Sequence, residues 1–75
     1  MNNKVRSSIR SNTRLFRDLL NVLEYGIDNL KTDLNNGDVA SLIRTMQDTN
    51  ETLQNLIDVM AEIEYTIYLN SLEES

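Results

Sequence analysis

The feature that most constrains this chain is a single strong helix-stop signal between two long stretches with helical apolar spacing. The signal is Asn35-Asn36-Gly37-Asp38, in which the glycine can take the left-handed conformation that ends a helix and the aspartate can cap the next helix. The chain contains no proline, the residue that most strongly interrupts a helix. The sequence therefore predicts two helices joined by one short turn.

Apolar residues on both sides of this turn recur at alternating intervals of three and four, which keeps them on one helix face. Val5 and Ile9 extend the first stripe toward the N-terminus, and Thr49 is the only polar member of the second. The stripes are Phe16, Leu20, Leu23, Ile27, Leu30 and Leu34, then Val39, Leu42, Met46, Thr49, Leu53, Leu56, Met60, Ile63 and Ile67. This spacing is typical of a coiled-coil seam, and we expect the core and self-association seam to consist of Phe16, Leu20, Leu23, Ile27, Leu30, Leu42, Met46, Leu53, Leu56, Met60 and Ile63.

A short turn between long amphipathic helices favours an antiparallel hairpin. We expect one all-α domain over residues 1–75, with helices over about 4–35 and 39–72 and the turn at about 35–38. The charge distribution favours the same pairing, because residues 1–17 carry five basic and no acidic side chains, whereas all twelve acidic residues follow. Antiparallel pairing brings the basic start of the first helix beside the acidic end of the second.

Gly26 lies inside an otherwise regular helical period. A glycine within a helix costs about 1 kcal/mol relative to alanine, so its presence indicates either a close approach by the neighbouring helix or a bend. We favour the close approach.

Each predicted helix carries more apolar surface than one seam can bury. A second stripe lies about 90° from the first on both helices, and a two-helix hairpin of this size has little stability of its own. We expect completion to a four-helix bundle, most simply as a homodimer, although a partner protein could cover the same surface. The candidate partner surface comprises Leu15, Leu19, Val22, Ile57, Tyr65, Tyr68, Leu72, Glu51, Asp58 and Glu62.

The composition argues against an enzyme. Cysteine, histidine and tryptophan are absent, which removes the usual thiol nucleophiles, zinc ligands and near-neutral proton carriers. The carboxylates lie on a predicted outer helix face, where they cannot converge on a metal or form a pocket. We therefore expect neither catalysis nor a metal or other cofactor.

Two charged stripes suggest alternative partners. Arg6, Arg10, Arg14 and Arg17 lie on one flank of the first helix and could contact phosphates of a nucleic acid. The net charge of -5 opposes this interpretation, as does the lack of an aromatic residue on the arginine flank itself, since Phe16 belongs to the seam stripe. The acidic row could instead fit a basic groove on another protein, or either stripe could be an ordinary solvated face.

These features together predict a small non-enzymatic interaction protein that self-associates or docks on an apolar or basic groove of a larger protein and regulates or inhibits it. Phages and mobile elements use small acidic chains of this kind against host nucleic-acid-handling machinery, and we offer that role as a hypothesis by association. The alternatives are a purely structural oligomerisation module and a nucleic-acid-binding hairpin. No stretch is long and apolar enough for a membrane span, and the polar N-terminus does not resemble a secretion signal, so we expect a cytoplasmic protein without membrane contact.

Overall fold

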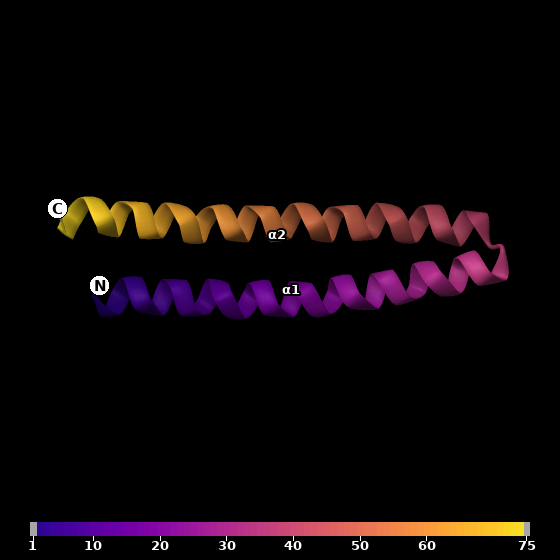
Figure 1. Ribbon diagram of the computed structural model, residues 1–75, viewed down its shortest axis with the longest axis horizontal. Coiled ribbons are helices and arrows are strands. Elements are labelled where there is room, and N and C mark those ends of the chain that lie inside the picture. Colours follow the sequence, from indigo (N-terminus) through magenta and orange to yellow (C-terminus); the bar gives the residue numbers. More distant parts are fainter. Residues whose placement is uncertain (1, 75) are drawn as a thin grey trace.

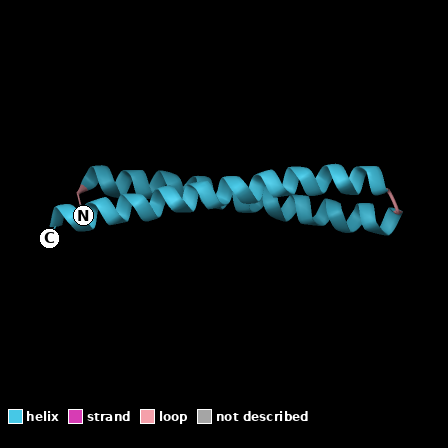
Figure 2. Ribbon diagram, turned by 90° about the horizontal axis from the view of Figure 1, so that it is seen from above, coloured by secondary structure: helices cyan, strands magenta, loops and turns pink. Residues whose placement is uncertain are grey.

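The computed structural model describes residues 2–74 and folds them into two long helices, α1 (Asn3–Asn36) and α2 (Val39–Glu74). The helices run in opposite directions side by side, and the described ends of the chain lie at the same end of the molecule (Figure 1). Seen from above, the helices cross each other near the middle of their length (Figure 2). The predicted all-α antiparallel hairpin is confirmed.

The turn forms as its sequence predicts. Gly37 has φ 66°, in the left-handed region, where a residue without a Cβ avoids a steric penalty. The backbone N–H groups of Gly37 and Asp38 donate to the carbonyl oxygens of Leu34 (3.2 Å) and Asp33 (3.0 Å), the double hydrogen bond of a Schellman motif. Asp38 then caps α2, because its Oδ1 accepts from the backbone N–H of Ser41 at 3.1 Å. At the opposite end, Asn2 caps α1 by accepting from Val5 N–H at 2.8 Å.

The two helices meet along a seam that repeats every three and four residues. Its members are partly or fully buried: Val5, Ile9, Asn12, Phe16, Leu19, Leu23, Gly26, Leu30 and Asp33 from α1, with Leu42, Thr45, Thr49, Thr52, Leu56, Val59, Ile63, Thr66 and Asn70 from α2. We call this set the inter-helix seam. It contains several small or polar side chains where the sequence pattern predicted leucine, isoleucine and methionine.

The predicted seam is thus divided by the structure. Six of its members lie in the inter-helix seam: Phe16, Leu23, Leu30, Leu42, Leu56 and Ile63. The other five are exposed on one flank: Leu20, Ile27, Met46, Leu53 and Met60. The three-four spacing could not separate these sets. On each helix, shared positions such as Leu23 and Leu56 keep the spacing when combined with either of two further sets of residues. In the structure, the inter-helix seam consists of these shared positions together with the more polar of the two further sets.

The hairpin is long and thin, with Cα extents of 56 × 15 × 11 Å. Its radius of gyration is 17.0 Å, whereas a compact domain of this length has about 11 Å. Among residues with described side chains, only Leu56 and Asn70 are buried. A single layer of two helices has no third element to close over the seam, so most large apolar side chains remain in contact with water.

Candidate interaction surface

Eight apolar side chains form a continuous exposed stripe along one side of the hairpin. They recur every seven residues on each helix and are between 38% and 68% exposed: Leu20, Ile27 and Leu34 from α1, with Val39, Met46, Leu53, Met60 and Ile67 from α2. We call this set the apolar face. A monomeric soluble protein rarely leaves such a contiguous stripe in water, and large apolar patches mark binding surfaces.

Both helices contribute to the same side of the molecule. Leu20, for example, directly follows seam residue Leu19, and Leu53 directly follows seam residue Thr52. In an antiparallel pair, residues that follow the seam on one helix adjoin those that follow it on the other, because the two helices are related by a two-fold rotation.

The opposite side of the hairpin has a different character. There, shallow grooves bring together residues that precede the seam, and Leu15 and Leu19 line one of about 280 Å³ with Asn55, Asp58 and Val59. The second holds Asp48 and Asn29 beside Val22 and Tyr25. Polar side chains thus alternate with the apolar ones nearest the seam on this side, whereas the eight positions nearest the seam that form the apolar face are all apolar.

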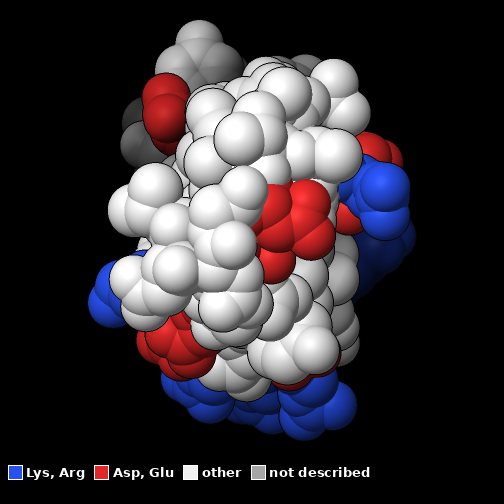
Figure 3. Space-filling view, turned by 90° about the vertical axis from the view of Figure 1, so that its right-hand side faces the viewer, with Lys and Arg blue, Asp and Glu red and all other residues white. Residues whose placement is uncertain are grey.

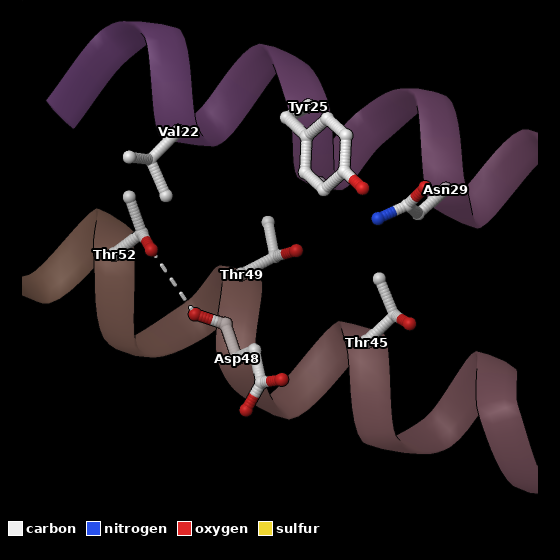
Figure 4. Close-up of a pocket in the computed structure, with 8 residues that line it drawn as sticks. Val22, Tyr25, Asn29, Thr45, Asp48, Thr49 and Thr52 are labelled. Carbon is white, nitrogen blue, oxygen red and sulfur yellow. Dashed lines mark hydrogen bonds between the residues drawn. The ribbon is translucent and has the colours of Figure 1, made fainter. Parts of the chain in front are cut away.

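The centre of the seam shows why the helices pair in this register. A Cβ at Gly26 would lie 2.8 Å from Oγ1 of Thr49, a distance that real Cβ contacts do not reach. Figure 4 shows Thr49 pointing from α2 toward α1 between the two backbones. The close approach expected at Gly26 is therefore confirmed, and the glycine allows it. Oγ1 of Thr49 is buried and has no hydrogen-bond partner among the described residues.

Near the turn, polar side chains fix the rotation of the helices about their axes. Oδ2 of Asp33 accepts hydrogen bonds from the hydroxyls of Ser41 (2.9 Å) and Thr45 (3.2 Å). These bonds join α1 to α2 within three turns of Gly37 and turn the Thr45 side of α2 toward α1. Met46, one residue later, is thereby directed to the flank, where it is 53% exposed. The sequence reasoning missed this cluster, whose signal was the threonine repeat at Thr45, Thr49 and Thr52.

The residues of the candidate partner surface do not lie together. Leu19 lies in the inter-helix seam, and Leu15 and Val22 lie on the grooved side. Tyr65 and Tyr68 are each 58% exposed and line a shallow depression with Ala61 and Glu64, all on α2. Asp58 lines the same groove as Leu15 and Leu19, and the remaining members are exposed along α2: Glu51, Ile57, Glu62 and Leu72. The structure therefore separates these ten residues among the seam, the grooved side and the outer surface of α2.

The arginine stripe is exposed along the first part of α1, at Arg6, Arg10, Arg14 and Arg17. Viewed from the turn end, Lys and Arg side chains gather at the lower edge, on the side of α1 (Figure 3). Further basic side chains lie at both flanks, acidic side chains lie in the middle and at the edges of this view, and most of the upper part, on the side of α2, is uncharged.

Within residues 2–74, no group of three or more acidic side chains is close enough to hold a metal ion. Over the same part of the chain, neither helix combines the length and the apolar character that crossing a bilayer requires. Comparison of the chain with protein-family models, curated proteins and solved structures found no match. The apolar face is consequently the strongest feature from which a function can be argued.

Proposed function

We propose that this chain is a non-enzymatic protein-interaction module that uses the apolar face to complete a four-helix bundle with another helical protein surface. One observation carries the proposal: the hairpin leaves its most apolar stripe exposed while threonine, asparagine and glycine occupy much of its own seam. Four-helix bundles bury two apolar faces per helix, one toward each neighbour. The second face of each helix here has no neighbour within the chain.

The surface area supports the same proposal. The chain exposes 5858 Å², whereas a compact monomer of its mass exposes about 4,700 Å². The excess accessible surface is about 1,100 Å² per chain. This is comparable to the surface that each partner buries in the interface of an obligate complex. Function would then lie in occupancy, because the bound module covers its partner's helices and so regulates or blocks their other contacts.

The test is a charge placed at the centre of the apolar face. Leu53→Asp should weaken association at least about 100-fold, since it would bury an unpaired carboxylate at the interface. Sedimentation equilibrium with a titration of protein concentration measures the effect. Gln47→Asp, which adds the same charge at an exposed position of α2 outside the apolar face, is the matched control and should leave association unchanged.

If the wild type associates and Leu53→Asp associates as strongly as the wild type and Gln47→Asp, the proposal is refuted. Circular dichroism of each variant shows whether the helices are retained, which separates lost association from lost folding.

A further inference from the structure

The partner of the apolar face and its direction of packing can both be argued from the hairpin itself. We infer that the face binds a second copy of this chain, with the two turns at the same end of the assembly, so that each α1 lies against α2 of the other copy. The inference rests on the proposed function and deepens it by naming the partner. A two-fold axis parallel to the hairpin relates the copies in this arrangement.

The positions of the apolar side chains along the long axis of the hairpin, which we call their heights, fit this symmetry. Gly26 lies against Thr49, which places Leu20 at about the height of Leu53, and Leu34 at the height of Val39, across the turn. A two-fold axis along the hairpin keeps every residue at its own height. Each α1 residue of the apolar face therefore meets an apolar residue of α2 from the second copy, and the overlap extends from Val39 to Leu53 on α2, while Met60 and Ile67 lie beyond Leu20.

The charges favour the same direction. Residues 4–17 carry five basic and no acidic side chains, and residues 58–74 carry five acidic and no basic ones. With the turns at the same end, each basic segment lies between two acidic segments, one from its own chain and one from the second copy. Reversing one hairpin would place α2 beside α2, where residues 39–57 are also net acidic, and would pair each basic segment with residues 18–36 (net charge -3) in place of residues 58–74 (net charge -5). Such like-charge contact opposes the reversed assembly.

The rim of the apolar face supplies side chains for this contact. On the outer edge of the face, Arg10 lies at the height of Glu64. The arrangement brings Arg10 of one copy beside Glu64 of the other, where the two side chains form an ion pair. Arg17 lies one seven-residue repeat after Arg10, at the height of Ile57, and Lys31 lies three repeats after Arg10, at the height of Ile43. Ile57 and Ile43 are 60% and 51% exposed in the single hairpin. The aliphatic stems of long basic side chains cover such apolar residues while their charged ends stay in water.

Engineered disulfides test both the partner and its direction, because the chain has no cysteine of its own. Arg10→Cys and Glu64→Cys are prepared as separate chains, mixed, refolded together and oxidised. The expected result is a covalent heterodimer, formed at least about tenfold more than from Arg14→Cys mixed with Glu64→Cys. Arg14 has the same charge and a neighbouring position on α1 but lies away from the face, so that mixture measures random collisions.

Three outcomes would overturn the inference. If Asn50→Cys and Ile57→Cys cross-link in place of the Arg10 and Glu64 pair, α2 lies beside α2, so the direction is wrong while the proposed function stands. If wild-type chain sediments as a monomer up to about 1 mM, a second copy is not the occupant. If the Arg14 mixture cross-links as well as the Arg10 mixture, the contact is unspecific.

Discussion

The inter-helix seam and the apolar face lie on adjacent sides of the same two helices, yet they differ in composition. The seam contains Gly26 and four threonines, and it buries the Thr49 hydroxyl, which has no hydrogen-bond partner within residues 2–74. The apolar face contains only leucine, isoleucine, valine and methionine. A chain folding alone would gain more by burying the aliphatic side chains of the apolar face between its helices, since each large aliphatic side chain contributes about 1.5 to 3 kcal/mol when fully buried.

The difference teaches that the composition of the seam permits a close approach of the helices, whereas the apolar face is left exposed where a second contact could form. Small side chains allow two backbones to come near each other, as Gly26 and Thr49 do, and polar groups near the turn set the helix rotation. The aliphatic stripe is then left at the position where a neighbour in a bundle would lie. Three experiments with substituted chains sharpen or break this comparison.

The largest effect is expected from a pair of matched leucine truncations, one in each region. Leu56 is 6% exposed in the seam and Leu53 is 43% exposed on the face. In dilute solution, where association is lost, Leu56→Ala should cost about 3 kcal/mol of unfolding free energy. Leu53→Ala should cost less than about 1 kcal/mol there, because its side chain is already partly in water.

Thermal and urea unfolding followed by circular dichroism measures both variants. In concentrated solution the order should change, since Leu53→Ala then also loses the contact between copies. Equal costs at high dilution would contradict the distinction between the seam and the face.

A smaller effect is expected at the close approach. Gly26→Ala gains about 1 kcal/mol of helix propensity, but the added Cβ meets Oγ1 of Thr49 at 2.8 Å, and overpacking of this kind costs about 1 to 3 kcal/mol. We expect a net loss of about 1 kcal/mol. In a Thr49→Ala background the clash is absent, so the same Gly26→Ala change should stabilise the protein.

A double-mutant cycle over these two positions, measured by urea unfolding, isolates their coupling. Additive effects of the two substitutions would show that the close approach does not decide the register.

The smallest effect is expected at the turn, which belongs to neither region. Gly37 has φ 66° and open space around its Cα, with nothing within 4 Å of an added Cβ. Gly37→Ala should therefore cost only the left-handed backbone penalty of about 1 kcal/mol. Unfolding free energy measures this cost, while sedimentation should show unchanged association. A loss of association in this variant would mean that the turn itself lies in the interface.

Much of the fold could be predicted from local patterns. The stop at Gly37, the cap at Asp38 and the helical spacing on both sides depend on residues close in sequence, and they predicted the hairpin and the close approach at Gly26. The division of the seam could not be predicted in this way. Leu23 and Leu56 belong to both possible seams, so spacing alone did not decide whether Thr52 or Leu53 completes the contact.

The residues of the candidate interaction surface could likewise be predicted only in part. The sequence placed Leu20 and Leu53 in one core and self-association seam with Leu23 and Leu56, whereas in the structure both lie outside the inter-helix seam. It also grouped Leu19 with Leu15 on an outer stripe, whereas Leu19 lies in the seam. Hydropathy ranks side chains by their apolar character, so it does not register the small residues that let two helices approach.

By itself, the sequence determined that this protein is a pair of amphipathic helices reversing at Gly37, because helical periodicity and chain reversal are local properties of the backbone and its nearest side chains. Only the tertiary structure decided which stripe faces the other helix. That choice depends on the rotation of each helix about its axis, which is set by the contact of Gly26 with Thr49 and by the hydrogen bonds of Asp33 to the hydroxyls of α2. These pairs are distant enough in sequence that no local pattern encodes them.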